Sequence, residues 1–145
     1  MSGGDAEHKL DIAWFQQALF TTGILAGMSF TALVLVLQAK SDFVPMSWGS
    51  SGNLYFLVLV CLLGSTSCSF VFASIMMTYL ASGNVPEGTK FKAYDHYTYA
   101  LYEFGFLALL FAIPLLFLPF DWVATAIVAG IEVVLFIFYH RLPDI

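Results

Sequence analysis

The sequence predicts an all-α integral membrane protein, a four-helix bundle that forms one membrane domain over residues 1–145. Two observations lead to this prediction. Of the 145 residues, 60% are hydrophobic and only 10% are charged, whereas charged residues make up about a quarter of a soluble domain. Four apolar segments, near 12–38, 54–81, 96–119 and 121–140, each supply the roughly 20 residues that cross a hydrocarbon core of about 30 Å.

The first apolar segment is expected to follow a loose polar N-terminus. Residues 1–9 are polar and contain glycine, and Asp11 can cap the helix that follows. This N-terminus lacks the positive charge that precedes the core of a signal sequence, so the segment is kept as a span. Its Gly23, Gly27 and Thr31 recur at every fourth position, which lets helix backbones approach closely. The stripe fits contact with another subunit or packing within the chain, and both interpretations stay open.

Residues 39–53 form the first predicted loop, because they contain Pro45, two glycines and four serines. The segment after this loop carries no charge, and its Ser65 and Ser69 belong to a second stripe of small residues. The hydroxyl groups of this helix either return hydrogen bonds to carbonyls one turn earlier or line a path for water or ions. Cys61 and Cys68 lie about 10 Å apart along the helix axis, too far for a disulfide.

The last two segments are joined by a turn so short that they must be antiparallel neighbours. The preceding loop is expected to end near Asp95, which can cap the third long helix. Asp121 can cap the fourth helix in the same way. Pro114 removes a helical hydrogen bond inside the third apolar segment and predicts a kink there.

Basic residues near the ends of the segments predict the orientation of the chain. A cytoplasmic N-terminus places four of the five basic residues on the inner side, namely Lys9, Lys90, Lys92 and Arg141. Only Lys40 then lies outside. By the positive-inside rule, we expect both termini in the cytoplasm and the protein in the cell membrane.

Two acidic side chains, Glu103 and Glu132, are the only charges inside an apolar span. Counted from His96 and His140, they lie about 10 and about 12 Å from the inner boundary, at one level. The same counting brings Gln16, Gln17 and Ser74 to this level, as further members of an ion or proton site. No Lys or Arg occurs in any span. Each glutamate is therefore protonated, shares a proton, coordinates a cation or faces water.

The polar layer predicts an oligomeric cation or proton pathway, because four helices of one chain barely enclose a pore. We therefore expect a homo-oligomer in the lipid bilayer, or assembly with other membrane subunits. One alternative is that the glutamates are neutral and hold the helices together by hydrogen bonds. The other is a non-catalytic accessory or assembly subunit of a larger membrane complex, for which short loops and high apolarity are equally natural.

Other functions lack the motifs that their chemistry requires. The chain has no phosphate-binding glycine loop, no HExxH motif and no nucleophile elbow, so an enzyme is not expected. The basic residues are scattered, which excludes a nucleic-acid partner. We expect no cofactor, and His8, His96 and His140 show no fixed metal-ligand spacing, so a metal site remains undetermined.

Overall fold

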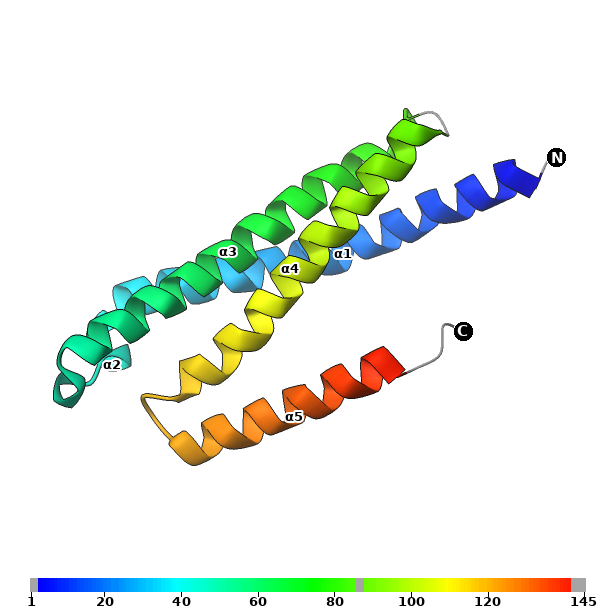
Figure 1. Ribbon diagram of the computed structural model, residues 1–145. Coiled ribbons are helices and arrows are strands. Elements are labelled where there is room, and N and C mark those ends of the chain that lie inside the picture. The colour runs from blue at the N-terminus through cyan, green and yellow to red at the C-terminus, as the bar shows by residue number, and fades with distance from the viewer. Residues whose placement is uncertain (1–2, 86–87, 142–145) are drawn as a thin grey trace.

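The computed structural model describes residues 3–85 and 88–141, and this part of the chain is helical without any strand (Figure 1). The predicted all-α class is therefore confirmed. Four long helices dominate, with a short helix α2 and a 3-10 turn η1 after the first of them. Their bounds are α1 Gly3–Gln38, α2 Lys40–Phe43, η1 Met46–Trp48, α3 Ser50–Ala81, α4 Thr89–Phe117 and α5 Trp122–Arg141.

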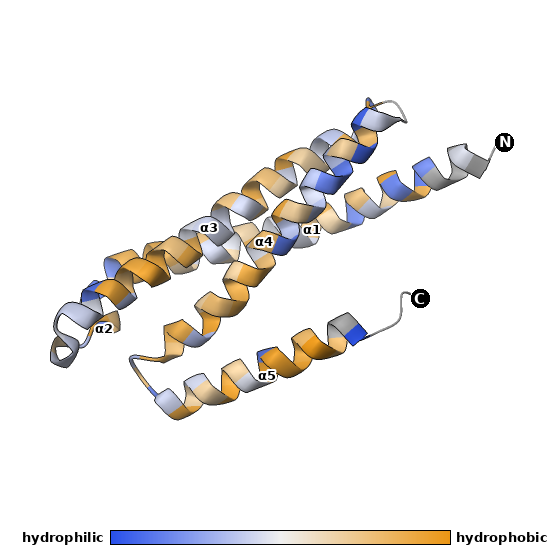
Figure 2. Ribbon diagram, viewed as in Figure 1, coloured by the Kyte–Doolittle hydropathy of each residue, from blue (hydrophilic) through white to orange (hydrophobic). Residues whose placement is uncertain are grey.

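Three of the described helices are long and apolar enough to cross a membrane, over His8–Gln38, Ser50–Ala81 and Thr89–Phe117. The apolar part of α5, Trp122–Phe138, is shorter. In Figure 2 the first turns of α4 carry hydrophilic residues, whereas its later turns are mainly hydrophobic. A polar helix end beside a long apolar stretch is typical of membrane-spanning helices.

Helix α3 is the centre of the fold, because it packs against both α1 and α4. Helix α5 makes its main contacts with α4, to which a short turn joins it. It lies beside the group of α1, α3 and α4 in Figure 1. The chain therefore forms a three-helix core with α5 at its side, rather than a closed four-helix bundle.

The packed faces of the core follow a seven-residue period. Helix α1 buries residues 15, 22, 29 and 36, α3 buries residues 59, 66, 73 and 80, and α4 buries residues 91, 98, 105 and 112. A seven-residue period keeps one seam of each helix facing its partner and produces left-handed crossings of about 20°. Several seam residues are small, such as Ser29, Ala73 and Gly105, and they allow the backbones to approach closely.

Two apolar clusters close the ends of the core. One contains Phe15, Met77, Leu80, Val85 and Phe91, beside the turn between α3 and α4. The other cluster contains Val36, Leu59, Leu63 and Ala112, near α2. Phe15 and Phe91 meet at a ring distance of 6.2 Å and an angle of 72°, which joins the first part of α1 to the first turn of α4.

Both helix starts placed at Asp11 and Asp95 were wrong. Helix α1 already includes Gly3, because no proline or glycine interrupts the chain between Gly4 and Gly23. Helix α4 begins at Thr89, directly after Gly88, whose φ of 149° lies outside the helical region. The loop predicted over 39–53 is also too long, because α2 and η1 occupy part of it and α3 begins at Ser50.

The cap at Asp121 is confirmed. The backbone N–H of Val123 donates a hydrogen bond to Asp121 Oδ1 at 2.8 Å, which satisfies one of the unpaired N–H groups of the first turn of α5. Helix α4 continues through Pro114 as far as Phe117. The turn therefore falls at Leu118–Phe120, where the sequence predicts it.

The small-residue stripe of α1 does not pack within the chain, so that interpretation was wrong. A Cβ atom added to Gly23 or Gly27 would meet no atom within 4 Å. Thr31 is exposed, and its hydroxyl donates to the Gly27 carbonyl at 2.8 Å. The face of α1 that packs on the core is a different one, which carries Phe15 and Thr22. Because every face of a membrane helix is apolar, the face that packs inward need not be the one with the smallest side chains.

The stripe of α3 packs over part of its length. Ser69 is buried and Ser65 is half-buried. Thr66 and Ser67 donate to the carbonyls of Leu62 and Leu63, at 2.8 and 2.9 Å. These two hydroxyl groups thus follow the packing interpretation, in which each returns its hydrogen bond to its own helix.

Candidate functional site

A pocket of about 450 Å³ lies between α4 and α5. Helix α4 supplies one stripe of its surface, with residues spaced three or four apart, and α5 supplies the facing wall. The stripe lies on a different face of α4 from the seam that packs on α3. The lining residues are Tyr99, Tyr102, Glu103, Phe106, Leu107 and Leu110 of α4 and Glu132, Leu135, Phe136 and Phe138 of α5.

The two glutamates come from different helices and both line this pocket. Within the chain Glu103 is exposed and Glu132 is half-buried, so the chain alone does not enclose either carboxyl group. No Lys, Arg or His belongs to the described lining. A carboxylate in hydrocarbon costs roughly 2.5–3.5 kcal/mol on insertion scales, and no basic side chain of this lining compensates it.

The aromatic wall of the pocket is anchored to the core. Tyr102 stacks on Phe106 with a ring distance of 6.4 Å and an interplanar angle of 7°. On its other side Tyr102 meets the edge of Phe70 at 5.8 Å, and Phe70 of α3 is completely buried. The Tyr102 ring is therefore in contact with the core of the bundle through α3.

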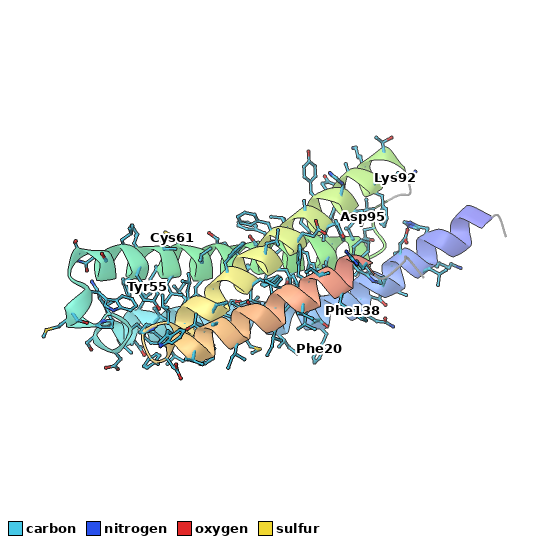
Figure 3. The ribbon with its side chains drawn as sticks, turned by 60° about the horizontal axis from the view of Figure 1, so that its bottom comes forward. Phe20, Tyr55, Cys61, Lys92, Asp95 and Phe138 are labelled. Atoms are coloured by element: carbon cyan, nitrogen blue, oxygen red, sulfur yellow. The ribbon has the colours of Figure 1, made fainter. Side chains whose placement is uncertain are left out.

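A second hollow of about 540 Å³ lies where α1 and α4 begin. It is polar, and it is lined by His8, Asp11, Gly88, Phe91, Lys92, Asp95, His96 and Tyr99. Lys92 and Asp95 are labelled at this end of α4 in Figure 3, far from Tyr55 at the other end of the core. Tyr99 lines both hollows, so the glutamate pocket adjoins a polar region at the end of the bundle.

This adjoining hollow was not found by sequence reasoning. It joins residues of α1 to residues of α4, and the sequence alone does not bring these helix starts together. The ring centres of His8 and Phe91 lie 4.7 Å apart, edge to face, and this contact joins α1 to α4 at the hollow. A polar face at positions 92, 95, 96 and 99 of α4 was the available signal.

The other predicted members of the polar layer do not join the glutamates. Gln16 and Gln17 are exposed on α1 and line neither hollow. Ser74 is half-buried on α3, outside the described lining, and its buried Oγ has no hydrogen-bond partner among the described residues. Counting along a helix axis gives depth but not direction, so only two of the five predicted residues share a pocket.

The described residues contain no group of three or more His, Cys, Asp and Glu side chains that could hold a metal ion. The side chain of His140 lies outside the described part. Cys61 and Cys68 are both exposed and free. The chemistry of the pocket is therefore that of two carboxyl groups, two phenols and a wall of Phe and Leu side chains.

Fold and pocket together define an all-helical protein with helices that can cross a membrane and an acidic, aromatic hollow at its side. No protein-family model, curated protein or solved structure matches this chain. The function is therefore argued from the pocket itself.

Proposed function

We propose that this protein forms a pathway for protons or another cation across the cell membrane, as a homo-oligomer, with Glu103 and Glu132 as its binding site. The observation that supports the proposal most is that both glutamates line one pocket without a basic side chain in the described lining. In a low-dielectric region such a pair favours a bound proton or a bound cation.

The proposal also needs a route from water to the glutamates. The polar hollow offers one, because it shares Tyr99 with the glutamate pocket and carries Asp11 and Asp95. The positive-inside rule assigns this end of the bundle to the cytoplasm. Cysteines introduced at Gly4 and Trp48 test that orientation: an impermeant maleimide added outside intact cells should label position 48 only.

The proposal takes α5 as the fourth span. Its 20 residues extend over about 30 Å at a rise of about 1.5 Å per residue. Because α5 covers the pocket from one side only, a second copy of the chain is needed to enclose the glutamates. The open face of Gly23 and Gly27 on α1 is the surface we assign to contact between copies.

Flux measurements in proteoliposomes test the pathway. The ions are H⁺, Na⁺, K⁺ and Ca²⁺, and the variants are Glu103→Gln, Glu132→Gln and the control Asp42→Asn, which removes an exposed carboxylate of α2. Glutamine keeps the shape and hydrogen-bonding capacity of glutamate but cannot ionise. We expect Glu132→Gln to abolish flux and Glu103→Gln to reduce it, with thermal stability nearly unchanged. Unchanged flux in both variants, or no flux for the wild type, would overturn the proposal.

A second candidate is an accessory subunit of a larger membrane complex, and the surface of α5 favours it. Val133, Val134 and Ile137 are exposed, and a Cβ atom on Gly130 would meet no atom within 4 Å. Such a face suits a helix of another protein as well as lipid. Purification from the native membrane separates the candidates: a foreign subunit in fixed stoichiometry supports the accessory role, and a homo-oligomer alone supports the pathway.

A further inference from the structure

We infer that the pocket between α4 and α5 binds a hydrophobic organic cation, such as an aryl or alkyl ammonium or phosphonium ion. The inference rests on the proposed function and names the class of cation for the same site. Three features of the pocket carry it: its charge, the small number of oxygen atoms in its lining, and its size. Each of them bears on a different alternative occupant.

The charge of the lining favours a cation. Glu103 and Glu132 are the only carboxyl groups in the described lining, and no basic side chain belongs to that lining. A neutral apolar molecule would leave both carboxyl groups without compensation. An anion would be repelled by either carboxylate. A cation is therefore the complementary occupant, and protons are its natural competitors.

The lining is a poor substitute for the hydration shell of a metal ion. Calcium takes six to eight oxygen ligands. The oxygen-bearing side chains of the described lining, Tyr99, Tyr102, Glu103 and Glu132, reach that range only if both glutamates bind through both oxygens and both phenols join them. Three or more His, Cys, Asp and Glu side chains never gather at one point of the described chain. An organic cation needs no such shell, because its charge is already covered by carbon.

The remaining wall suits the carbon surface of an organic cation. Phe106, Phe136 and Phe138 line the pocket together with three leucines, and cations are attracted to the faces of aromatic rings within about 6 Å. The Tyr102–Phe106 stack is held against Phe70, so this part of the wall is formed before a ligand arrives. The same contact occurs elsewhere in the chain, where Lys40 Nζ lies 4.9 Å from the ring centre of Phe56.

The size of the pocket suits a small molecule. A volume of about 450 Å³ falls within the range of about 300–1,000 Å³ that is typical of ligand pockets. The pocket therefore has room for a compact cation.

Equilibrium binding of tetraphenylphosphonium to the full chain in nanodiscs tests the inference. Empty nanodiscs correct for partitioning into lipid, and triphenylphosphine oxide serves as the uncharged comparison. We expect saturable binding that Glu132→Gln weakens at least tenfold and that the double variant Glu103→Gln/Glu132→Gln removes. Phe106→Ala should weaken binding several-fold. The matched control Phe104→Ala should not, because Phe104 lies on α4 outside the pocket lining.

Competition experiments complete the test. Acid pH should displace tetraphenylphosphonium, whereas Na⁺ and Ca²⁺ at equal ionic strength should not. Equal binding by the wild type and the double variant, equal effects of Phe106→Ala and Phe104→Ala, or displacement by Ca²⁺ would each overturn the inference. If the double variant does not fold, the comparison of Phe106→Ala with Phe104→Ala still tests the inference. A foreign helix that crosslinks to Phe136 would overturn it as well.

The inference and the proposed function can fail separately. Saturable binding of tetraphenylphosphonium without ion flux in proteoliposomes would retain the ligand class and remove the pathway. Proton flux that depends on Glu132, without any binding of tetraphenylphosphonium, would retain the pathway and remove the ligand class.

Discussion

The hydroxyl of Tyr55, at the start of α3, donates a hydrogen bond to the backbone carbonyl of Leu115, near the end of α4. In a continuing helix the Leu115 carbonyl would accept from the N–H group of residue 119. Residue 119 is a proline and has no N–H group. The tyrosine therefore satisfies a carbonyl that the sequence of α4 leaves unpaired, and it ties the two helices together at this end of the core.

Tyr55→Phe should destabilise the fold without changing its shape, because it removes the hydroxyl and leaves the carbonyl unpaired. The expected loss is about 1 kcal/mol, since an unsatisfied buried acceptor costs about 1–3 kcal/mol and interhelical bonds in membranes average about 0.6 kcal/mol. Unfolding in a fixed detergent measures it. The control is Tyr97→Phe, whose ring is 63% exposed. Equal stability of the two variants would contradict the assigned role of Tyr55.

Helices α3 and α4 lie close together at Gly105. A Cβ atom added there would stand 3.1 Å from the Cβ atom of Ser69 and 3.2 Å from the ring of Phe70. Gly105→Ala must push the helices apart by a few tenths of an ångström, and overpacking of a core costs about 1–3 kcal/mol. We expect a lower unfolding temperature for Gly105→Ala, measured in the same detergent.

Gly64→Ala is the matched control for this prediction. Gly64 lies within α3, and a Cβ atom on it would meet nothing within 4 Å. Alanine is favoured over glycine in a helix by up to about 1 kcal/mol, so this variant should be as stable as the wild type or more stable. A Gly105→Ala protein that unfolds at or above the temperature of Gly64→Ala would show that the contact is relaxed.

The exposed stripe of α1 predicts self-association. Because nothing within the chain contacts a Cβ atom on Gly27, Gly27→Leu should leave the monomer folded and dissociate the oligomer in mild detergent. Native mass spectrometry measures the oligomeric state, and circular dichroism checks the fold. Thr21→Leu, at another exposed position of α1, should remain oligomeric. A wild-type protein that is already monomeric would remove the basis of this prediction.

The helices could be predicted from the sequence, but most of their contacts could not. Apolar composition over 20 or more residues identifies a span, and helices α1 and α3 end at Gln38 and Ala81, as predicted. Which face turns inward is a different question, because lipid is as apolar as a core and gives the helix no amphipathic signal. The stripe of Gly23 and Gly27 was therefore as plausible as the true seam through Thr22 and Ser29.

The sequence predicts a similar membrane depth for Glu103 and Glu132, because the distance of each residue from the inner boundary is counted from a helix end. The short turn at Asp121 made α4 and α5 neighbours, and both side chains line the pocket between them. Gln16 and Gln17 had no such constraint. Their helix packs on α3, and Phe15, one position earlier, takes the inward direction.

The position of Tyr99 predicts how the two hollows are connected. It is the residue that the described linings of the glutamate pocket and the polar hollow share, so we expect a proton that passes between them to pass its side chain. Tyr99→Leu removes the phenol at this point but keeps an apolar side chain. We expect proton flux in proteoliposomes to fall at least tenfold. Tyr97→Leu, at an exposed position outside both linings, is the control. Equal flux in the two variants would mean that protons reach Glu103 and Glu132 by another route.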